Sequence, residues 1–132
     1  MTRHESRETA FIICFEMLFQ KEADVETIIN AAGEGENYQI SKFAKDLALT
    51  VYNNVEEIDL LIEENLVKWS IGRISKVSRA VLRLAVAEIK YTDIPVGAAV
   101  NEAVEICKKY STPQDSSFIN GVLASVAKQV RK

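Results

Sequence analysis

Hydrophobic residues recur three and four positions apart through most of the chain. The clearest stretch is 94–110, where Pro95 can open a helix because the first helical position needs no N–H donor. One apolar face follows it: Val96, Ala99, Val100, Ala103, Ile106, Cys107 and Tyr110. Similar spacing predicts helices over about 2–20, 24–32, 41–69, 75–90 and 115–130, with Asn53-Asn54 able to break the third. The pattern therefore predicts an all-α chain.

The last of these segments carries a conflicting signal. Asn120-Gly121 stands between two apolar pairs, which favours a β-hairpin turn. The apolar residues on both sides nevertheless keep helical spacing as far as Val130, and Asp115 or Ser116 is a suitable N-cap. We predict a helix, in which Gly121 costs about 1 kcal/mol relative to alanine and allows a neighbouring helix to approach closely. Asn120 would lie at the same contact.

The first predicted helix is apolar on every side. Thr2 and Glu5 fit a capping box at its start. The run 10–15 could be a buried strand if seen alone, but the cap and the length of the segment favour a helix. A helix that is apolar all round is expected to be central, with the other helices packed around it.

Composition places the chain among soluble globular proteins. Its 132 residues, 48% hydrophobic and 27% charged, suit a single domain over 1–132, with helical halves of about 1–68 and 69–132. No apolar run approaches the roughly 18 residues of a membrane span, and no signal peptide is visible, so a cytoplasmic protein is expected. Cys14 and Cys107 are isolated in sequence and are interpreted as buried hydrophobic residues, with no disulfide or metal site.

Charge is distributed unevenly. Residues 20–67 carry three basic and eleven acidic residues, whereas residues 68–90 carry six basic residues against Glu88 alone. Lys76, Arg79, Arg83 and Lys90 would share one side of the helix over 75–90. This row could attract phosphate, but it could equally be a solvated face or pair with the acidic half.

The sequence offers little for catalysis. The sole histidine, His4, lies near a terminus, no nucleophile–base pair or metal-ligand spacing is visible, and Glu88 is expected to pair internally. The glycines of 33–37 have acidic neighbours and no lysine, so they do not form a phosphate-binding loop. We expect no enzyme activity and no cofactor.

The order of these pieces resembles the NusB family of transcription antitermination factors over nearly the whole chain. The similarity is carried by Arg7-Glu-Thr-Ala with Cys14-Phe15, by residues 79–89, by Ile94-Pro95, by residues 100–108 and by the segment Phe118-Ile-Asn-Gly-Val-Leu. It implies an all-helical fold of two small bundles packed into one compact domain, without catalysis. It also implies binding of boxA-type single-stranded RNA together with the ribosomal small-subunit protein NusE, in the transcription elongation complex.

Several site residues follow from matching positions to the family and from charge. The residues expected to contact RNA are Arg3, Arg7, Lys76, Arg79, Gln114 and Phe118, and those expected to contact the partner protein are Phe15, Ser78 and Arg79. Bases would stack on Phe118 while the cations hold phosphates. Asn101, Glu102 and Asn120 are assigned mainly to structure.

Two other interpretations were compared with this one. A helix-turn-helix DNA-binding module would use 76–90 as its recognition helix, but that segment has its own core face and no Asn or Gln suited to adenine edges. A NusB-like domain also precedes a catalytic domain in some RNA methyltransferases, which leaves only a distant relation for a chain that ends at Lys132.

Overall fold

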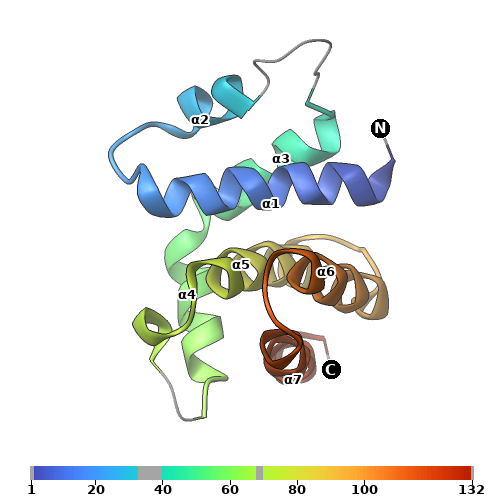
Figure 1. Ribbon diagram of the computed structural model, residues 1–132. Coiled ribbons are helices and arrows are strands. Elements are labelled where there is room, and N and C mark those ends of the chain that lie inside the picture. Colours follow the sequence, from blue (N-terminus) through green and yellow to red (C-terminus); the bar gives the residue numbers. More distant parts are fainter. Residues whose placement is uncertain (1, 33–39, 68–69, 132) are drawn as a thin grey trace.

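The computed structural model describes residues 2–32, 40–67 and 70–131, and these residues form helices without any strand (Figure 1). The elements are α1 (Arg3–Phe19), α2 (Val25–Ala32), α3 (Lys42–Asn53), α4 (Val55–Glu64), the 3-10 helix η1 (Ile71–Arg73), α5 (Lys76–Tyr91), α6 (Val96–Tyr110) and α7 (Pro113–Val130). The prediction of an all-helical fold is confirmed. The predicted glycine loop and Trp69 lie outside the described residues.

Local capping signals set most helix starts. Thr2 and Glu5 form the predicted capping box of α1, and Ser41 and Ser75 accept backbone N–H groups at the starts of α3 and α5. The predicted start of α7 is wrong, because Thr112 rather than Asp115 or Ser116 is its N-cap and Pro113 occupies the first turn. The predicted break at Asn53-Asn54 is confirmed, whereas α4 ends at Glu64, short of 69.

Asn120 and Gly121 lie inside α7, so the prediction of a helix rather than a β-hairpin is confirmed. The reason predicted for Gly121 is wrong. A Cβ at this position would meet nothing within 4 Å, and both residues are exposed. In the part of the chain that the structure describes, no neighbouring helix approaches Gly121 closely, and Asn120 is exposed rather than buried at a helix contact.

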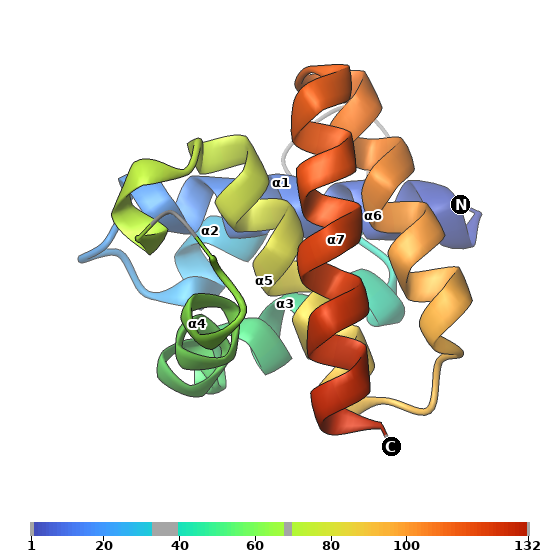
Figure 2. The ribbon, with the colours of Figure 1, turned by 90° about the horizontal axis from the view of Figure 1, so that it is seen from below.

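The central helix is α5, not α1 as predicted. Every residue from Ala80 to Ile89 is buried, because α5 packs against α1, α3, α4, α6 and α7. In contrast, α1 leaves Ile12 and Phe19 exposed, at 39% and 55%. Figures 1 and 2 show α5 between α1 and α7, with α6 alongside. One hydrophobic core therefore joins α1, α3 and α4 to α6 and α7 through α5.

A smaller core lies on the outer side of α1, where Ile13 packs with Val25, Ile28 and Ile29 of α2 and Ala48 of α3. At the opposite end of the molecule Arg131 donates hydrogen bonds to the carbonyls of Ile89, Ile94 and Thr92 at 2.8, 2.6 and 2.6 Å. The bonds to Ile89 and Thr92 satisfy carbonyl groups at the C-terminal end of α5, and the bond to Ile94 satisfies one in the loop that follows. None of the described helices is long and apolar enough to cross a membrane.

Candidate nucleic-acid interface

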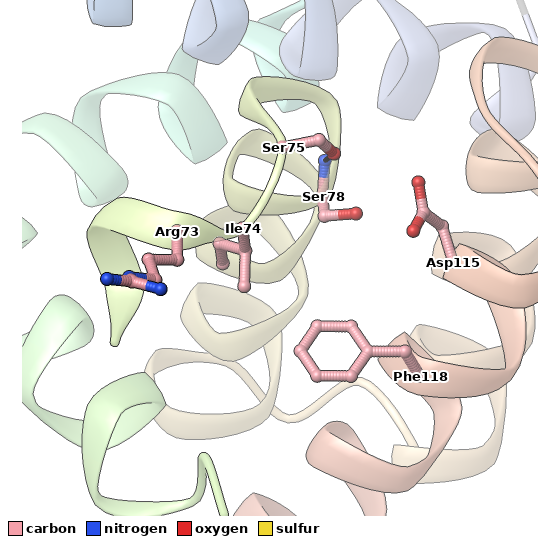
Figure 3. Close-up of a pocket in the computed structure, with 6 residues that line it drawn as sticks. All are labelled: Arg73, Ile74, Ser75, Ser78, Asp115 and Phe118. Carbon is pink, nitrogen blue, oxygen red and sulfur yellow. Dashed lines mark hydrogen bonds between the residues drawn. The ribbon is translucent and has the colours of Figure 1, made fainter. Parts of the chain in front are cut away.

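A cleft of about 270 Å³ lies where the first turn of α5 meets the first half of α7 (Figure 3). It is lined by Arg73, Ile74, Ser75, Ser78, Asp115 and Phe118. Two of these residues, Ser78 and Phe118, are predicted site residues that stand forty positions apart in the sequence. The fold brings them together because α5 and α7 pack side by side.

Ser78 has an unusual environment for a serine. Its backbone N–H donates to the Ser75 hydroxyl at 3.1 Å as part of the N-cap of α5. Its own Oγ is buried and has no hydrogen-bond partner among the described residues. Figure 3 shows this hydroxyl pointing into the cleft. A buried hydroxyl left unpaired costs about 1–3 kcal/mol, so this group is a candidate for bonding to a ligand.

The opposite wall of the cleft belongs to α7. The backbone N–H of Asp115 donates to the hydroxyl of its N-cap, Thr112, at 3.1 Å, and its carboxylate accepts a hydrogen bond from the Ser111 hydroxyl. Phe118 follows about one turn later, is half-buried against the core and turns its ring into the cleft (Figure 3). Gln114 lies on the same first turn and is exposed.

Phe15 belongs to a row of aromatic rings along α1. Its ring centroid lies 6.0 Å from that of Phe11 and 5.0 Å from that of Phe19, and Tyr110 extends the row at 4.9 Å from Phe11. The Lys76 ammonium lies 5.5 Å from the Phe19 centroid, so the start of α5 meets the end of this row. The row is thus next to the helix turn that carries Ser78.

Arg3 and Arg7 lie at the other end of α1. Their guanidinium carbons are 4.0 and 5.4 Å from the ring centroid of Phe43. Sixteen helical residues separate Arg3 from Phe19, a rise of about 24 Å. The cations predicted to hold phosphate therefore do not form one patch.

Arg7 is buried rather than exposed as predicted. Its Nε donates to Glu88 Oε1 at 2.7 Å, and both side chains are less than a tenth exposed. Burial raises the pKa of Glu88, and the bond from Arg7 opposes that shift. The internal pairing predicted for Glu88 is confirmed, and the guanidinium of Arg7 is not presented to solvent for direct phosphate contact.

The basic row of α5 pairs mainly with the acidic helix α4. Arg83 makes two bonds to the Asp59 carboxylate, at 2.8 and 2.6 Å, and the Arg79 guanidinium lies 3.6 Å from the same group. Lys90 pairs with Glu57. Of the alternatives considered for this row, pairing with the acidic half is the one observed for these three residues. Arg79 does not line the cleft that holds Ser78.

Sequence reasoning missed four residues of the cleft lining: Arg73, Ile74, Ser75 as a wall of the cleft, and Asp115. The spacing Thr112-x-x-Asp115 is a capping signal that could have placed Asp115 on the first turn of α7 beside Phe118. In Figure 3 the Arg73 guanidinium points away from the Phe118 ring. Among the described residues no group of three or more His, Cys, Asp or Glu is arranged to hold a metal ion.

Comparison with known proteins shows the family to which this chain belongs. The model of the NusB family matches residues 4–128. The chain belongs to the NusB family. It is 39% identical to the transcription antitermination protein NusB of Geobacillus kaustophilus, over the full length of both chains.

Solved structures of the NusB family share the fold. One, of T. maritima NusB, has a TM-score of 0.88 and 35% identity, and the match covers 100% of this chain and 94% of that one. Another, of the antitermination factors NusB and NusE in complex with double-stranded RNA, has a TM-score of 0.86 and 32% identity, with coverage of 98% and 99%. The family resemblance predicted from the sequence is confirmed.

The helix-turn-helix alternative does not agree with the fold. A recognition helix must leave one face free to enter the major groove of DNA. From Ala80 to Ile89, α5 is buried on all sides, so this segment has no such face. That interpretation is therefore wrong for 76–90.

Proposed function

We propose that this protein is a transcription antitermination factor that binds boxA-type single-stranded RNA together with the ribosomal small-subunit protein NusE. The observation that carries the proposal is the cleft between α5 and α7, with the unpaired Ser78 hydroxyl and the half-buried Phe118 ring. This cleft lies in a fold that the chain shares with the NusB protein of a solved NusB–NusE–RNA complex. The protein would act in the cytoplasm, within the elongation complex.

RNA recognition in this cleft would depend on stacking and hydrogen bonds more than on charge. Phe118 offers an aromatic face to an unstacked base, and such stacking contributes about 1–3 kcal/mol per base. The Ser78 hydroxyl and the Asp115 carboxylate can accept hydrogen bonds from the N–H groups of that base, and Ser78 can also donate one.

Phosphate contacts would be few. Lys76 is exposed at the start of α5, and Gln114 is exposed on the first turn of α7, both beside the cleft. Arg3 would reach only the far end of a strand that follows α1. With so few contacts, the logarithm of the affinity should fall gently with the logarithm of the salt concentration, with a slope of about 0.7 per phosphate.

The partner protein would use the aromatic row of α1. Phe19 is 55% exposed and Ile12 39% exposed, and Phe15 lies between Phe11 and Phe19. Exposed aromatic and aliphatic side chains of this kind are typical anchors of protein interfaces. Since Lys76 contacts Phe19 and belongs to the same helix turn as Ser78, a protein on this row would also border the RNA cleft.

Two leucine substitutions separate these roles. Phe118→Leu keeps apolar contact with the core but removes the aromatic face, and it should weaken boxA RNA binding by about ten-fold, or about 1.4 kcal/mol. The control, Phe19→Leu, should leave binding of RNA alone unchanged and weaken binding of NusE. Fluorescence anisotropy with labelled boxA and scrambled RNA measures both, with and without NusE.

Circular dichroism would verify that both variants remain folded. Equal RNA affinity of Phe118→Leu and the unmodified protein would contradict the proposed RNA site. Equal affinity for boxA and scrambled RNA, even with NusE present, would contradict the proposed function.

A further inference from the structure

Gly121 has no role within the folded chain that the structure reveals. It lies in the middle of the 18-residue helix α7, where glycine is less favourable than alanine. A side chain at this position would meet nothing within 4 Å, and the surrounding backbone is ordinary helix. Neither packing nor backbone conformation therefore requires a glycine.

What the missing side chain leaves open is a groove of about 410 Å³ between α7 and the segment that follows α4. Its lining consists of Asn65, Val67, Ser117, Phe118, Gly121, Val122 and Ser125. Val67 is 93% exposed and stands at the edge of this groove. The groove is therefore flanked by apolar side chains, and helix backbone is exposed at Gly121.

One wall of the groove is fixed by side-chain hydrogen bonds. The Ser125 hydroxyl donates to Asn65 Oδ1 at 2.6 Å, and Asn65 Nδ2 donates to the Leu61 carbonyl at 2.8 Å and to Gln129 Oε1 at 3.0 Å. These bonds tie the end of α4 to α7. Because the side chains of Asn65 and Ser125 are paired in this way, this wall is preformed and leaves the apolar side chains of the groove to contact a ligand.

The groove is continuous with the proposed RNA cleft. Phe118 lines both, and Gly121 follows it by three helical residues, a rise of about 4.5 Å. Among the described residues the lining contains no Lys or Arg and consists of uncharged side chains. A nucleobase fits this lining better than the sugar-phosphate backbone does.

We propose that this groove holds a second nucleobase of the bound RNA, adjacent in the strand to the base in the cleft. That base would contact the Phe118 ring, the exposed backbone at Gly121 and the side chain of Val67. The inference rests on the proposed RNA-binding function and adds a base position to it. Any side chain at position 121 would occupy the space of this base.

Gly121→Leu places a side chain in the groove, where a Cβ would meet no described atom within 4 Å, and Asn120→Leu is its matched control. Asn120 is exposed on the same helix and outside the groove lining, so it adds the same side chain elsewhere. Both variants should remain helical, and Gly121→Leu should have the higher melting temperature, since the mid-helix glycine is removed. Anisotropy is measured with a boxA RNA and with shorter RNAs that lack nucleotides from either end.

For the unmodified protein and Asn120→Leu, removal of one particular end nucleotide should weaken binding by about ten-fold. Gly121→Leu should bind the full RNA about ten-fold more weakly and should show no further loss with that shortened RNA, because the two changes remove the same contact. Additive losses would overturn the second base position while leaving the RNA-binding function intact. Unchanged RNA affinity of Gly121→Leu, with or without weaker NusE binding, would also overturn it. Failure of the unmodified protein to bind any boxA RNA would overturn both proposals.

Discussion

Two regions of this molecule use polar side chains in opposite ways. Where α1 meets α5 and α6, charged groups are paired within the chain: Arg7 with Glu88 at 2.7 Å, and His4 with Glu102 at 2.6 Å. At the cleft between α5 and α7, the Ser78 hydroxyl is buried with no hydrogen-bond partner among the residues that the structure describes, and the Phe118 ring is half open to solvent. The charged groups of the first region are paired with one another, whereas the second region leaves a hydroxyl and an aromatic ring available to a ligand.

This difference shows why positive charge is a poor guide to the binding site in this fold. The basic residues with the best helical alignment, Arg79, Arg83 and Lys90, lie beside carboxylates of α4. Their charges stabilise the packing of α5 against α4. In the cleft itself, the groups left for a ligand are the Ser78 hydroxyl and the Phe118 ring, and they are recognised only after the hydrogen-bond partners of each polar group have been identified.

Of the substitutions that test this comparison, Arg7→Met is expected to have the largest effect on stability. The substitution leaves the Glu88 carboxylate buried without its partner, and it should lower the free energy of unfolding by about 3–5 kcal/mol. Arg3→Met is the matched control, because Arg3 also lies over the Phe43 ring but is exposed, and it should cost less than about 1 kcal/mol. Urea unfolding measures both.

The double variant Arg7→Met with Glu88→Leu completes the test, since it removes both buried charges. It should recover most of the lost stability and bind boxA RNA as the unmodified protein does. Loss of RNA affinity in this folded variant would mean that Arg7 contacts RNA after all, as the sequence alone suggested.

A smaller change is expected from Ser78→Ala, which should increase stability but decrease RNA affinity. Removing a buried hydroxyl that has no partner should raise the free energy of unfolding by about 1 kcal/mol, seen as a melting temperature higher by about 4 °C. RNA affinity should nevertheless fall by about five-fold, because one hydrogen bond to the base is lost. A destabilised variant with unchanged RNA affinity would show that the hydroxyl serves the fold.

The fold was predictable from sequence where the signal is local. The Thr2-Glu5 capping box, the Ser41 and Ser75 caps and the helical spacing across Asn120-Gly121 all lie within a few residues of what they determine. The identity of the central helix was not predictable in this way. Arg83 gives α5 the appearance of a half-exposed helix, and only its pairing with Asp59, 24 positions away in sequence, allows it to be buried.

The candidate site was predicted only in part, and for a related reason. The family resemblance identified Ser78 and Phe118, which the structure places in one cleft. The resemblance also suggested Arg7 and Arg79, and positive charge suggested Arg3. The structure places all three elsewhere, because their positions depend on acidic and aromatic residues of other helices. The open space beside Gly121 depends on which of the described helices pack against α7, and no local sequence pattern reports that.

The most direct test of the account is a titration of the ¹⁵N-labelled protein with boxA RNA, followed by the amide resonances of each residue. If RNA binds at the cleft and groove, the largest shifts will fall on residues 75–78 and 115–121, while residues 102–109 of α6 will change little. Shifts concentrated on α6 and the buried Arg7 region, with the amides around Ser78 and Phe118 unchanged, would contradict it.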